Sequence, residues 1–324
     1  MSVISLPTAE ATGTAVFVSR KRKPGYTILI ICFRTGRSMK TYLDCIPCFM
    51  KQALRAGRIS GMDESGVKLL LDEVGCMIRD LPLESTPPAT GDLIYGKIRQ
   101  MTGVNDPYDE IKKETIREAL ELYPELKNIV KKSDNRMLTA AKIAIAGNVI
   151  DLGVGNDFNI AKDVHAILNQ EFAILHFEEF LESLNEAESV LYLGDNAGES
   201  VFDKLLIEEL GKPVTYVVRD VPVINDVTME DAIDSGLDTV AEIISSGSSA
   251  PAIIPSLCSD GFLDRFESAE MIISKGQGNY EGLSNVERPI FVLLKAKCQV
   301  IANDLGVDTG DIILATPREL NRHQ

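Results

Sequence analysis

Short apolar runs, separated by helical patterns, dominate the second half of the chain. Six of these runs have the length of buried strands and lie at residues 189–193, 213–218, 239–244, 269–274, 289–294 and 311–315. The segments between them are long enough for helical crossovers, as the spacing of Val201, Leu205, Leu206 and Leu210 illustrates. Because parallel strands need such crossovers, the alternation predicts an α/β fold with a three-layer, mainly parallel sheet over residues 186–324.

The first half has a different pattern, in which apolar residues recur at helical spacing. Val67, Leu70 and Val74 illustrate this period, and an alanine-rich helix is predicted over residues 137–150. We therefore predict a mainly helical domain over residues 39–185, packed against one end of the sheet and covering part of its site.

Residues 1–38 lack helical periodicity altogether. A basic cluster, Arg20 to Lys23, precedes a strand-length apolar run from Tyr26 to Phe33, and Met39 begins the helical part. We predict that residues 1–38 are a poorly ordered N-terminal extension that the rest of the fold does not need.

The composition narrows the possible partners. The 324 residues carry a net charge of −15, which disfavours a nucleic-acid partner because a phosphate backbone repels an acidic surface. No apolar run approaches the ~18 residues of a membrane span, so no membrane partner is predicted. Six cysteines are few for this length and indicate reduced thiols and a cytoplasmic location. The oligomeric state is not indicated by any sequence feature.

Polar residues that could bind a metal ion or a phosphate follow three of the predicted strands. Asp195 and Asn196 follow one strand, Asp226 lies in the loop after the next, and Lys275 ends a third beside two glycines. In open α/β sheets the carboxyl ends of parallel strands bind ligands. Carboxylate and amide oxygens suit Mg²⁺ or Mn²⁺, and a lysine beside glycines suits a phosphate. Each acidic residue alone has a helix N-cap as its alternative, but three such strand ends together favour a metal site.

Other residues suggest different chemistry. Val149 to Asn156 imitates the glycine-rich loop of S-adenosylmethionine methyltransferases, but that loop should follow a buried strand rather than an alanine-rich helix. Cys45 and Cys48 have redox or metal-ligand spacing, yet without a second pair we expect two buried helical thiols. The histidines lie apart from every motif, which disfavours catalysis by a Ser-His-Asp or Cys-His arrangement.

Several ordered motifs together resemble one known family. The main ones are Gly-Asp-Asn-Ala-Gly-Glu (194–199), Arg-Asp-Val-Pro-Val-Ile-Asn-Asp-Val-Thr (219–228) and Ser-Lys-Gly-Gln-Gly-Asn-Tyr-Glu (274–281). Over about residues 39 to 315 the chain resembles the damage-control phosphatases, formerly domain of unknown function 89, which have an ARMT1-like metal-binding domain. Asp-Cys-Ile-Pro-Cys (44–48) resembles the prokaryotic, cysteine-containing subfamily.

The resemblance implies a metal-dependent phosphomonoesterase that acts on small phosphorylated metabolites, such as sugar phosphates or damaged phosphometabolites. It implies Asp195, Asn196 and Asp226 as metal ligands. It further implies a phosphate-binding role for Lys275 and places Glu199, Asn148 and Asn279 around the substrate. Asp195, Asp226 and Lys275 would be the catalytic residues.

The implied cofactor is a divalent cation, Mg²⁺ or Mn²⁺, with Co²⁺ or Ni²⁺ as alternatives. Water or a carboxylate would attack phosphorus, and water is favoured because no cysteine or histidine adjoins the predicted ligands. Two other functions stay open at this point. They are an S-adenosylmethionine-dependent carboxyl methyltransferase and a metal- or metabolite-binding protein without turnover.

Overall fold

The computed structural model describes residues 16–23, 26–33, 39–147 and 160–316, and the chain divides into two compact units, 1–38 and 39–324. In the first unit, β1 (Val16–Lys23) and β2 (Tyr26–Phe33) pair with each other in antiparallel orientation along their whole length. Of this hairpin, only the apolar run of β2 was noticed in the sequence. The glycine-rich stretch at 149–156 and Asn148 lie outside the described residues.

In the described part of the second unit, seven strands form one sheet in the order β3-β9-β8-β7-β4-β5-β6. Their bounds are β3 (Phe172–Leu175), β4 (Val190–Leu193), β5 (Val214–Val218), β6 (Glu242–Ser245), β7 (Met271–Lys275), β8 (Ile290–Lys295) and β9 (Ile312–Ala315). Neighbouring strands run parallel except β8 and β9. The predicted α/β class with a mainly parallel sheet is confirmed. The sequence missed β3, a short edge strand inside a stretch with helical periodicity.

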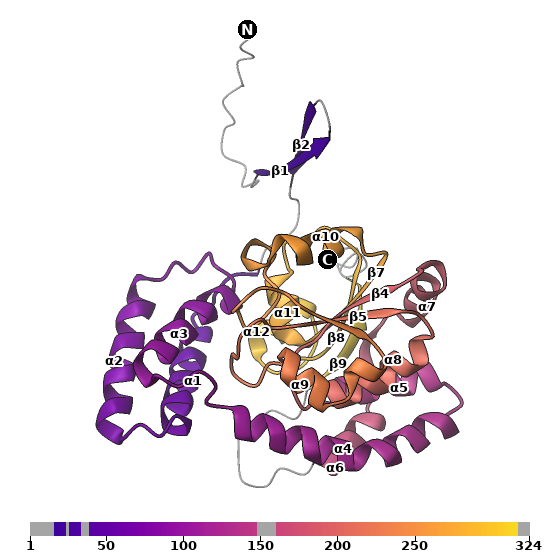
Figure 1. Ribbon diagram of the computed structural model, residues 1–324, viewed down its shortest axis with the longest axis horizontal. Coiled ribbons are helices and arrows are strands. Elements are labelled where there is room, and N and C mark those ends of the chain that lie inside the picture. The colour runs from indigo at the N-terminus through magenta and orange to yellow at the C-terminus, as the bar shows by residue number, and fades with distance from the viewer. Residues whose placement is uncertain (1–15, 24–25, 34–38, 148–159, 317–324) are drawn as a thin grey trace. The chain divides into compact units, whose positions relative to one another are not determined.

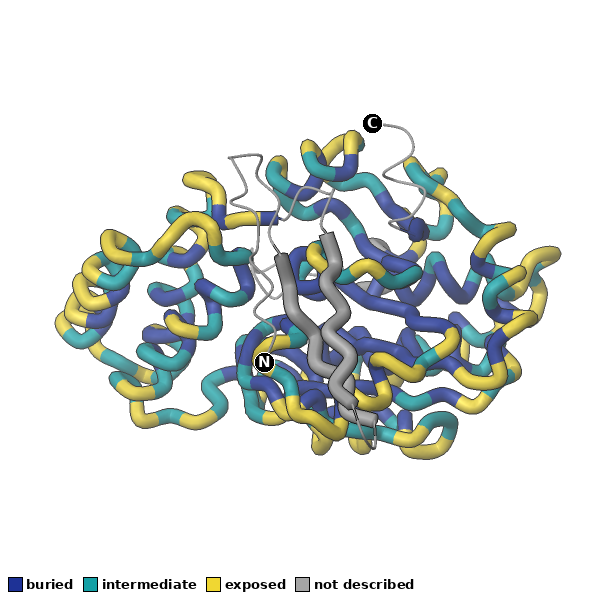
Figure 2. Tube along the Cα trace, turned by 90° about the horizontal axis from the view of Figure 1, so that it is seen from above, coloured by how far each residue is buried: buried dark blue, intermediate teal, exposed yellow. Residues whose placement is uncertain are grey.

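Helices cover both faces of this sheet and make the three layers (Figure 1). One face carries α4 (Asp109–Lys132), α5 (Arg136–Gly147), α6 (Ile160–Leu168), α7 (Phe177–Glu186) and α8 (Ser200–Leu210); the other carries α10 (Asp260–Ser268) and α12 (Gln299–Leu305). Successive strand side chains supply the two cores in turn, so that Tyr192 faces α8 while Leu191 and Leu193 face the other layer. The strands accordingly form the dark blue centre in Figure 2, with the exposed turns of the helices around them.

The first three helices form a separate core beside the sheet. They are α1 (Cys45–Ile59), α2 (Glu64–Asp80) and α3 (Pro87–Thr102). Local signals start and stop them: Asp63 accepts a hydrogen bond from the Gly66 N–H at the start of α2, and Gly103 ends α3 in the left-handed conformation. Val223, from the loop after β5, joins this core. The predicted helical domain is therefore divided, because α1 to α3 pack on that loop while α4 to α7 form a layer of the sheet.

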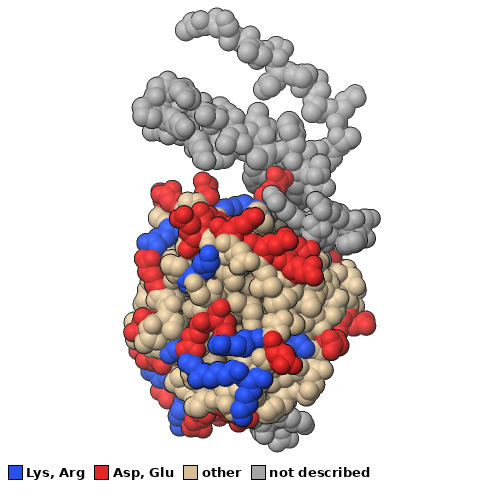
Figure 3. Space-filling model, turned by 90° about the vertical axis from the view of Figure 1, so that its right-hand side faces the viewer, with Lys and Arg blue, Asp and Glu red and all other residues tan. Residues whose placement is uncertain are grey.

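The remaining short helices lie in the connections after β5, β6 and β7. They are α9 (Met229–Asp234), α11 (Gly276–Gly282) and two 3₁₀ turns, Leu237–Thr239 and Pro255–Leu257. On the face seen in Figure 3, acidic side chains gather above a group of basic ones. Among the described residues, no helix is both long enough and apolar enough to span a bilayer.

Candidate active site

Two loops at the carboxyl edge of the sheet carry the predicted metal ligands. Asp195 and Asn196 follow β4, and Asp226 lies in the loop after its parallel neighbour β5. The loops are joined through their backbones: the Val227 N–H donates to the Asp195 carbonyl at 2.8 Å, and Asn196 forms an antiparallel bridge to Asp226. The fold thus brings all three predicted ligands together.

Two backbone positions shape these loops. A Cβ atom at Gly194 would lie 2.5 Å from the Tyr216 hydroxyl, so the β4 loop can pass over β5 only with glycine there. Ile224 has a φ of 47°, which is strained for a β-branched residue. Its side chain packs against the core of α1 to α3, and this packing helps to hold the strained loop beside Asp226.

Neither acidic ligand candidate is a helix cap. The N-cap of α8 is Glu199, and the N-cap of α9 is Thr228, which forms a capping box with Asp231. Asp195 and Asp226 both precede these caps. The helix-cap alternative is therefore wrong for both, and another interaction must account for their buried carboxylates.

A buried arginine lies between the two carboxylates. Arg219, directly after β5, is 1% exposed, and its Nε donates to Asp226 Oδ2 at 2.7 Å. Its Nη2 lies 3.7 Å from Asp195 Oδ1, and its Nη1 has no hydrogen-bond partner among the described residues. The sequence interpretation gave this arginine no role, although its position at a strand end was the available signal.

The Asn196 side chain has a defined orientation. Its Nδ2 donates to Asp195 Oδ2 and to Glu199 Oε2, both at 3.0 Å. Because the amide nitrogen points at these carboxylates, the carboxamide oxygen Oδ1 is directed away from them. Glu199 is fully buried, and its second oxygen accepts from Lys275.

Lys275 lies elsewhere than expected for a direct phosphate ligand. Its side chain is 0% exposed, and its Nζ donates to Glu199 and Asp203 at 2.5 Å and to the Ala144 carbonyl at 2.8 Å. Burial alone would lower the pKa of Lys275, but the charges of Asp203 and Glu199 raise it above its usual value. All three ammonium N–H donors are engaged by protein oxygens. A direct contact with phosphate would require Lys275 to give up one of these partners.

Asn279 also differs from its expected role at the substrate. Its Oδ1 accepts from Arg219 and from the Ile253 N–H, and its Nδ2 donates to the carbonyls of Gly194 and Lys275. This side chain is 0% exposed, and protein groups occupy both its donors and both its acceptor lone pairs. Asn279 therefore joins the β4, β5 and β7 strand ends rather than offering a group to a substrate.

The electrostatics of the site fit a cation. Burial, together with repulsion from Glu199 and Asp226, raises the pKa of Asp195 to about 7, and burial also raises the pKa of Asp226. Within the described chain, His, Cys, Asp and Glu side chains alone form no group of three that would hold a metal ion. Asn196 adds an amide oxygen to the two carboxylates as a candidate third ligand. Two carboxylates and one amide oxygen are suitable ligands for Mg²⁺ or Mn²⁺.

Two further charged residues at this edge were missed from the sequence. Burial, together with repulsion from Asp195 and Asp304, raises the pKa of Glu281 to about 8. Lys297, half-buried after β8, lowers the pKa of Asp195 through its positive charge. Glu281 ends the motif at 274–281, and Lys297 follows a predicted strand, so both positions carried a signal that was not used.

Comparisons with known proteins agree on one family. The model of the damage-control phosphatase ARMT1-like domain matches residues 41–313. The chain belongs to this family. It is 32% identical over 282 residues to a damage-control phosphatase from Pyrococcus horikoshii, covering 85% of this chain and 97% of that protein. It is 33% identical over 286 residues to a damage-control phosphatase from Archaeoglobus fulgidus, covering 85% and 98%.

The structural comparison agrees with the sequence comparison. The crystal structure of a domain of unknown function 89 family protein from Pyrococcus horikoshii matches this chain with a TM-score of 0.77 and 31% identity. The match covers 86% of this chain and 99% of that one. The family resemblance and the fold class inferred from the sequence motifs are confirmed.

This ARMT1-like domain keeps its CxxC cysteines near the edge of the site. Cys45 and Cys48 lie in the first turn of α1, where Cys45 is half-buried and Cys48 is exposed, so the expectation of two buried thiols is wrong for Cys48. Burial raises the pKa of Cys45 to about 11, with smaller contributions from Glu281, Cys298 and Cys48. Among the residues whose side chains are described, no two cysteines form a disulfide.

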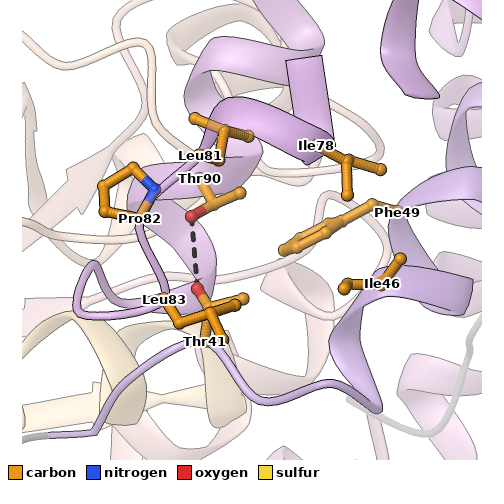
Figure 4. Close-up of a pocket in the computed structure, with 8 residues that line it drawn as sticks. All are labelled: Thr41, Ile46, Phe49, Ile78, Leu81, Pro82, Leu83 and Thr90. Carbon is orange, nitrogen blue, oxygen red and sulfur yellow. Dashed lines mark hydrogen bonds between the residues drawn. The ribbon is translucent and has the colours of Figure 1, made fainter. Parts of the chain in front are cut away.

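A small apolar pocket of the ARMT1-like domain lies away from this chemistry (Figure 4). It is lined by Thr41, Ile46, Phe49, Ile78, Leu81, Pro82, Leu83 and Thr90. Thr41 Oγ1 and Thr90 Oγ1 are hydrogen-bonded across it at 3.2 Å. Its lining contains none of the predicted site residues that the structure describes, so the pocket belongs to the core of α1 to α3.

Proposed function

We propose that the phosphatase activity of this chain uses a divalent cation held by Asp195, Asn196 and Asp226. The observation that supports this most strongly is the joining of the β4 and β5 loops, which gathers two buried carboxylates and one oriented carboxamide. Mg²⁺ or Mn²⁺ is the proposed ion, with Co²⁺ and Ni²⁺ as alternatives. Such a cation supplies Lewis-acid polarisation of a phosphoryl oxygen and activation of water.

The protein side chains around this site have separate tasks in the proposal. Arg219 holds the Asp226 carboxylate in place through its 2.7 Å contact. Lys297 is the candidate cation for the substrate phosphate, because it is half-buried at the same edge and its charge acts on Asp195. Water is the proposed nucleophile, because Asp195 and Asp226 are both assigned to the metal.

The proposed substrates are phosphate monoesters of small metabolites, including damaged phosphometabolites. Support comes from the two relatives that are named damage-control phosphatases and align over almost their whole length. The S-adenosylmethionine-dependent alternative receives no such support. Six cysteines in 324 residues, with no disulfide among those whose side chains are described, agree with a reducing compartment, so the cytoplasm is the proposed location.

A phosphate-release assay tests this function. The purified chain is stripped of metal with EDTA and assayed on a panel of sugar phosphates and other phosphoesters, with each of the four cations restored in turn. Release is expected only with a restored cation. Lys297→Ala should raise KM while leaving the melting temperature unchanged. Equal release with and without metal, or no release from any ester by protein that binds Mn²⁺, would contradict the proposal.

A further inference from the structure

A network of buried, hydrogen-bonded polar side chains lies beside the Asp195–Asn196–Asp226 site. Lys275 joins the carboxylates of Glu199 and Asp203, and both salt bridges are 2.5 Å long. Asp203 also accepts from the hydroxyls of Tyr192 at 2.7 Å and Tyr216 at 2.8 Å. All five side chains are 0% exposed, so solvent does not share these hydrogen bonds.

The donors in this buried network determine which groups must accept hydrogen bonds. An ammonium group can only donate, so Lys275 requires an oxygen at Glu199 Oε1. The Asn196 Nδ2 donates to the other oxygen, Glu199 Oε2. Glu199 therefore accepts from both sides, which a carboxylate does and a carboxamide does not.

We propose that Glu199, with Lys275 behind it, is a positioning residue that sets the rotation of the Asn196 amide and so turns its Oδ1 toward the cation. This inference rests on the proposed metal site and explains how a neutral ligand is kept in its binding orientation. The Asn196 amide rotated by half a turn would present N–H donors to a cation, which repels them. Asp203, held by two tyrosines, keeps Lys275 in place.

The substitution Glu199→Gln tests this by replacing one acceptor oxygen at position 199 with an NH₂ donor. Lys275 still requires an acceptor, so the glutamine oxygen faces Lys275 and the glutamine NH₂ faces Asn196. The Asn196 amide then loses the acceptor at position 199 and keeps only the one at Asp195, so its oxygen is held less firmly toward the cation. Mn²⁺ affinity should fall by ~10–100-fold, the usual cost of losing a group that orients a metal ligand.

The substitution Asn196→Asp separates orientation from charge. A carboxylate at position 196 presents an oxygen to the cation in either rotation, so its orientation no longer matters. When Glu199→Gln is added, the glutamine NH₂ can donate to this carboxylate. In the Asn196→Asp background, Glu199→Gln should therefore leave Mn²⁺ affinity unchanged or increase it. If Glu199 acted only through its negative charge, the same substitution would weaken binding in both backgrounds.

Mn²⁺ binding to metal-free protein is measured by calorimetry for the four combinations, with melting temperatures recorded for each. Glu208→Gln is the control: it removes the same charge from α8, the helix that Glu199 precedes as N-cap, but its carboxylate accepts from Tyr123 and Lys127 of α4 and not from Asn196 or Lys275. This control should bind Mn²⁺ like the wild type. Weakening by Glu199→Gln in both backgrounds would overturn the inference.

A second variant tests the orientation from the Lys275 side. Lys275→Met combined with Glu199→Gln removes the ammonium that fixed the glutamine, so the glutamine oxygen is free to face Asn196 again. This double variant should bind Mn²⁺ more tightly than Glu199→Gln alone, and equal or weaker binding would contradict the proposed orientation. Wild-type phosphate release with Mn²⁺ tests the proposed function separately from this orientation.

Discussion

The strand ends of β4 and β5 differ from that of β7, although the sequence gives all three the same pattern. In each, an apolar run ends in polar residues close to glycine or proline. After β4 and β5, the backbone turns over the edge and gathers Asp195, Asn196 and Asp226. At the end of β7, Lys275 is enclosed by Glu199 and Asp203 of neighbouring segments and by the Ala144 carbonyl of α5.

The difference teaches that the availability of a charged strand-end residue to a ligand depends on the sign of the charges that adjoin it in the folded sheet. The β4 and β5 ends bring the like charges of Asp195, Asp226 and Glu199 together, and Arg219 offsets only part of the rise that burial and this repulsion cause in the pKa of Asp195. The β7 end brings opposite charges together, and they satisfy each other. A pattern of single strands does not contain this information, because it depends on which side chains adjoin in the sheet.

The largest expected effect is loss of turnover at the β4 and β5 ends. Asp195→Ala and Asp226→Ala each remove a proposed metal ligand, so phosphate release should fall by ~10³-fold or more. Asn196→Ala should lose less, because a neutral ligand contributes less to holding a cation. Steady-state kinetics at saturating Mn²⁺ make the measurement, with melting temperatures to verify folding.

Asp220→Ala provides the control for these variants. Asp220 lies on the same β5 loop but is exposed and accepts from Ser245. It should turn over substrate like the wild type. If Asp195→Ala or Asp226→Ala also kept wild-type turnover and wild-type Mn²⁺ affinity, the metal site would lie elsewhere.

The next largest effect is on stability, at the β7 end. Lys275→Met leaves the buried carboxylates of Glu199 and Asp203 without their counterion, so the free energy of unfolding should fall by ~3–5 kcal/mol. Lys127→Met, which breaks a partly exposed pair with Glu208, should cost only ~0–1 kcal/mol. Urea unfolding measures both. A Lys275→Met variant with wild-type stability but much weaker phosphate binding would restore the role first predicted for Lys275.

The sequence predicted most of the fold because the strands of a parallel sheet are apolar on both faces and stand out as runs. It also pointed to Asp195, Asn196 and Asp226, which the structure brings together, because strand-end loops carry their polar residues in contiguous motifs. Arg219 and Glu281 were not assigned roles, since their importance comes from burial beside carboxylates, which the order of residues along the chain does not show. The pairing of Lys275 with Glu199 and Asp203 was likewise not visible in the sequence, so Lys275 was expected at the substrate.

A smaller effect tests whether burial and the neighbouring carboxylates raise the pKa of Glu281 in α11. The pKa of Glu281 is about 8 in the folded protein and ~4.3 in an unfolded chain. Between these pH values the folded state holds a proton that the unfolded state has lost, so stability falls as pH rises. Glu281→Gln lacks this titration, and its advantage over the wild type should grow from pH 5 to pH 8.5 by ~4 kcal/mol at most, since each unit of pKa difference corresponds to ~1.4 kcal/mol.

Urea unfolding in EDTA at several pH values measures this difference. Glu267→Gln is the control, since Glu267 is exposed on α10. A constant difference between Glu281→Gln and the wild type across this range would show that Glu281 is not held in its protonated form by the edge.

The smallest expected effect comes from deleting residues 1–38. β1 and β2 pair residue by residue with each other and form a sheet of their own, whereas the seven-stranded sheet and both of its helical layers are built from described residues after Met39. The shortened chain should therefore match the full chain in metal-dependent phosphate release and within ~0.5 kcal/mol in stability. A drop of more than a few degrees in melting temperature would mean that the apolar run of β2 stabilises the enzyme, and the prediction from the sequence would be wrong.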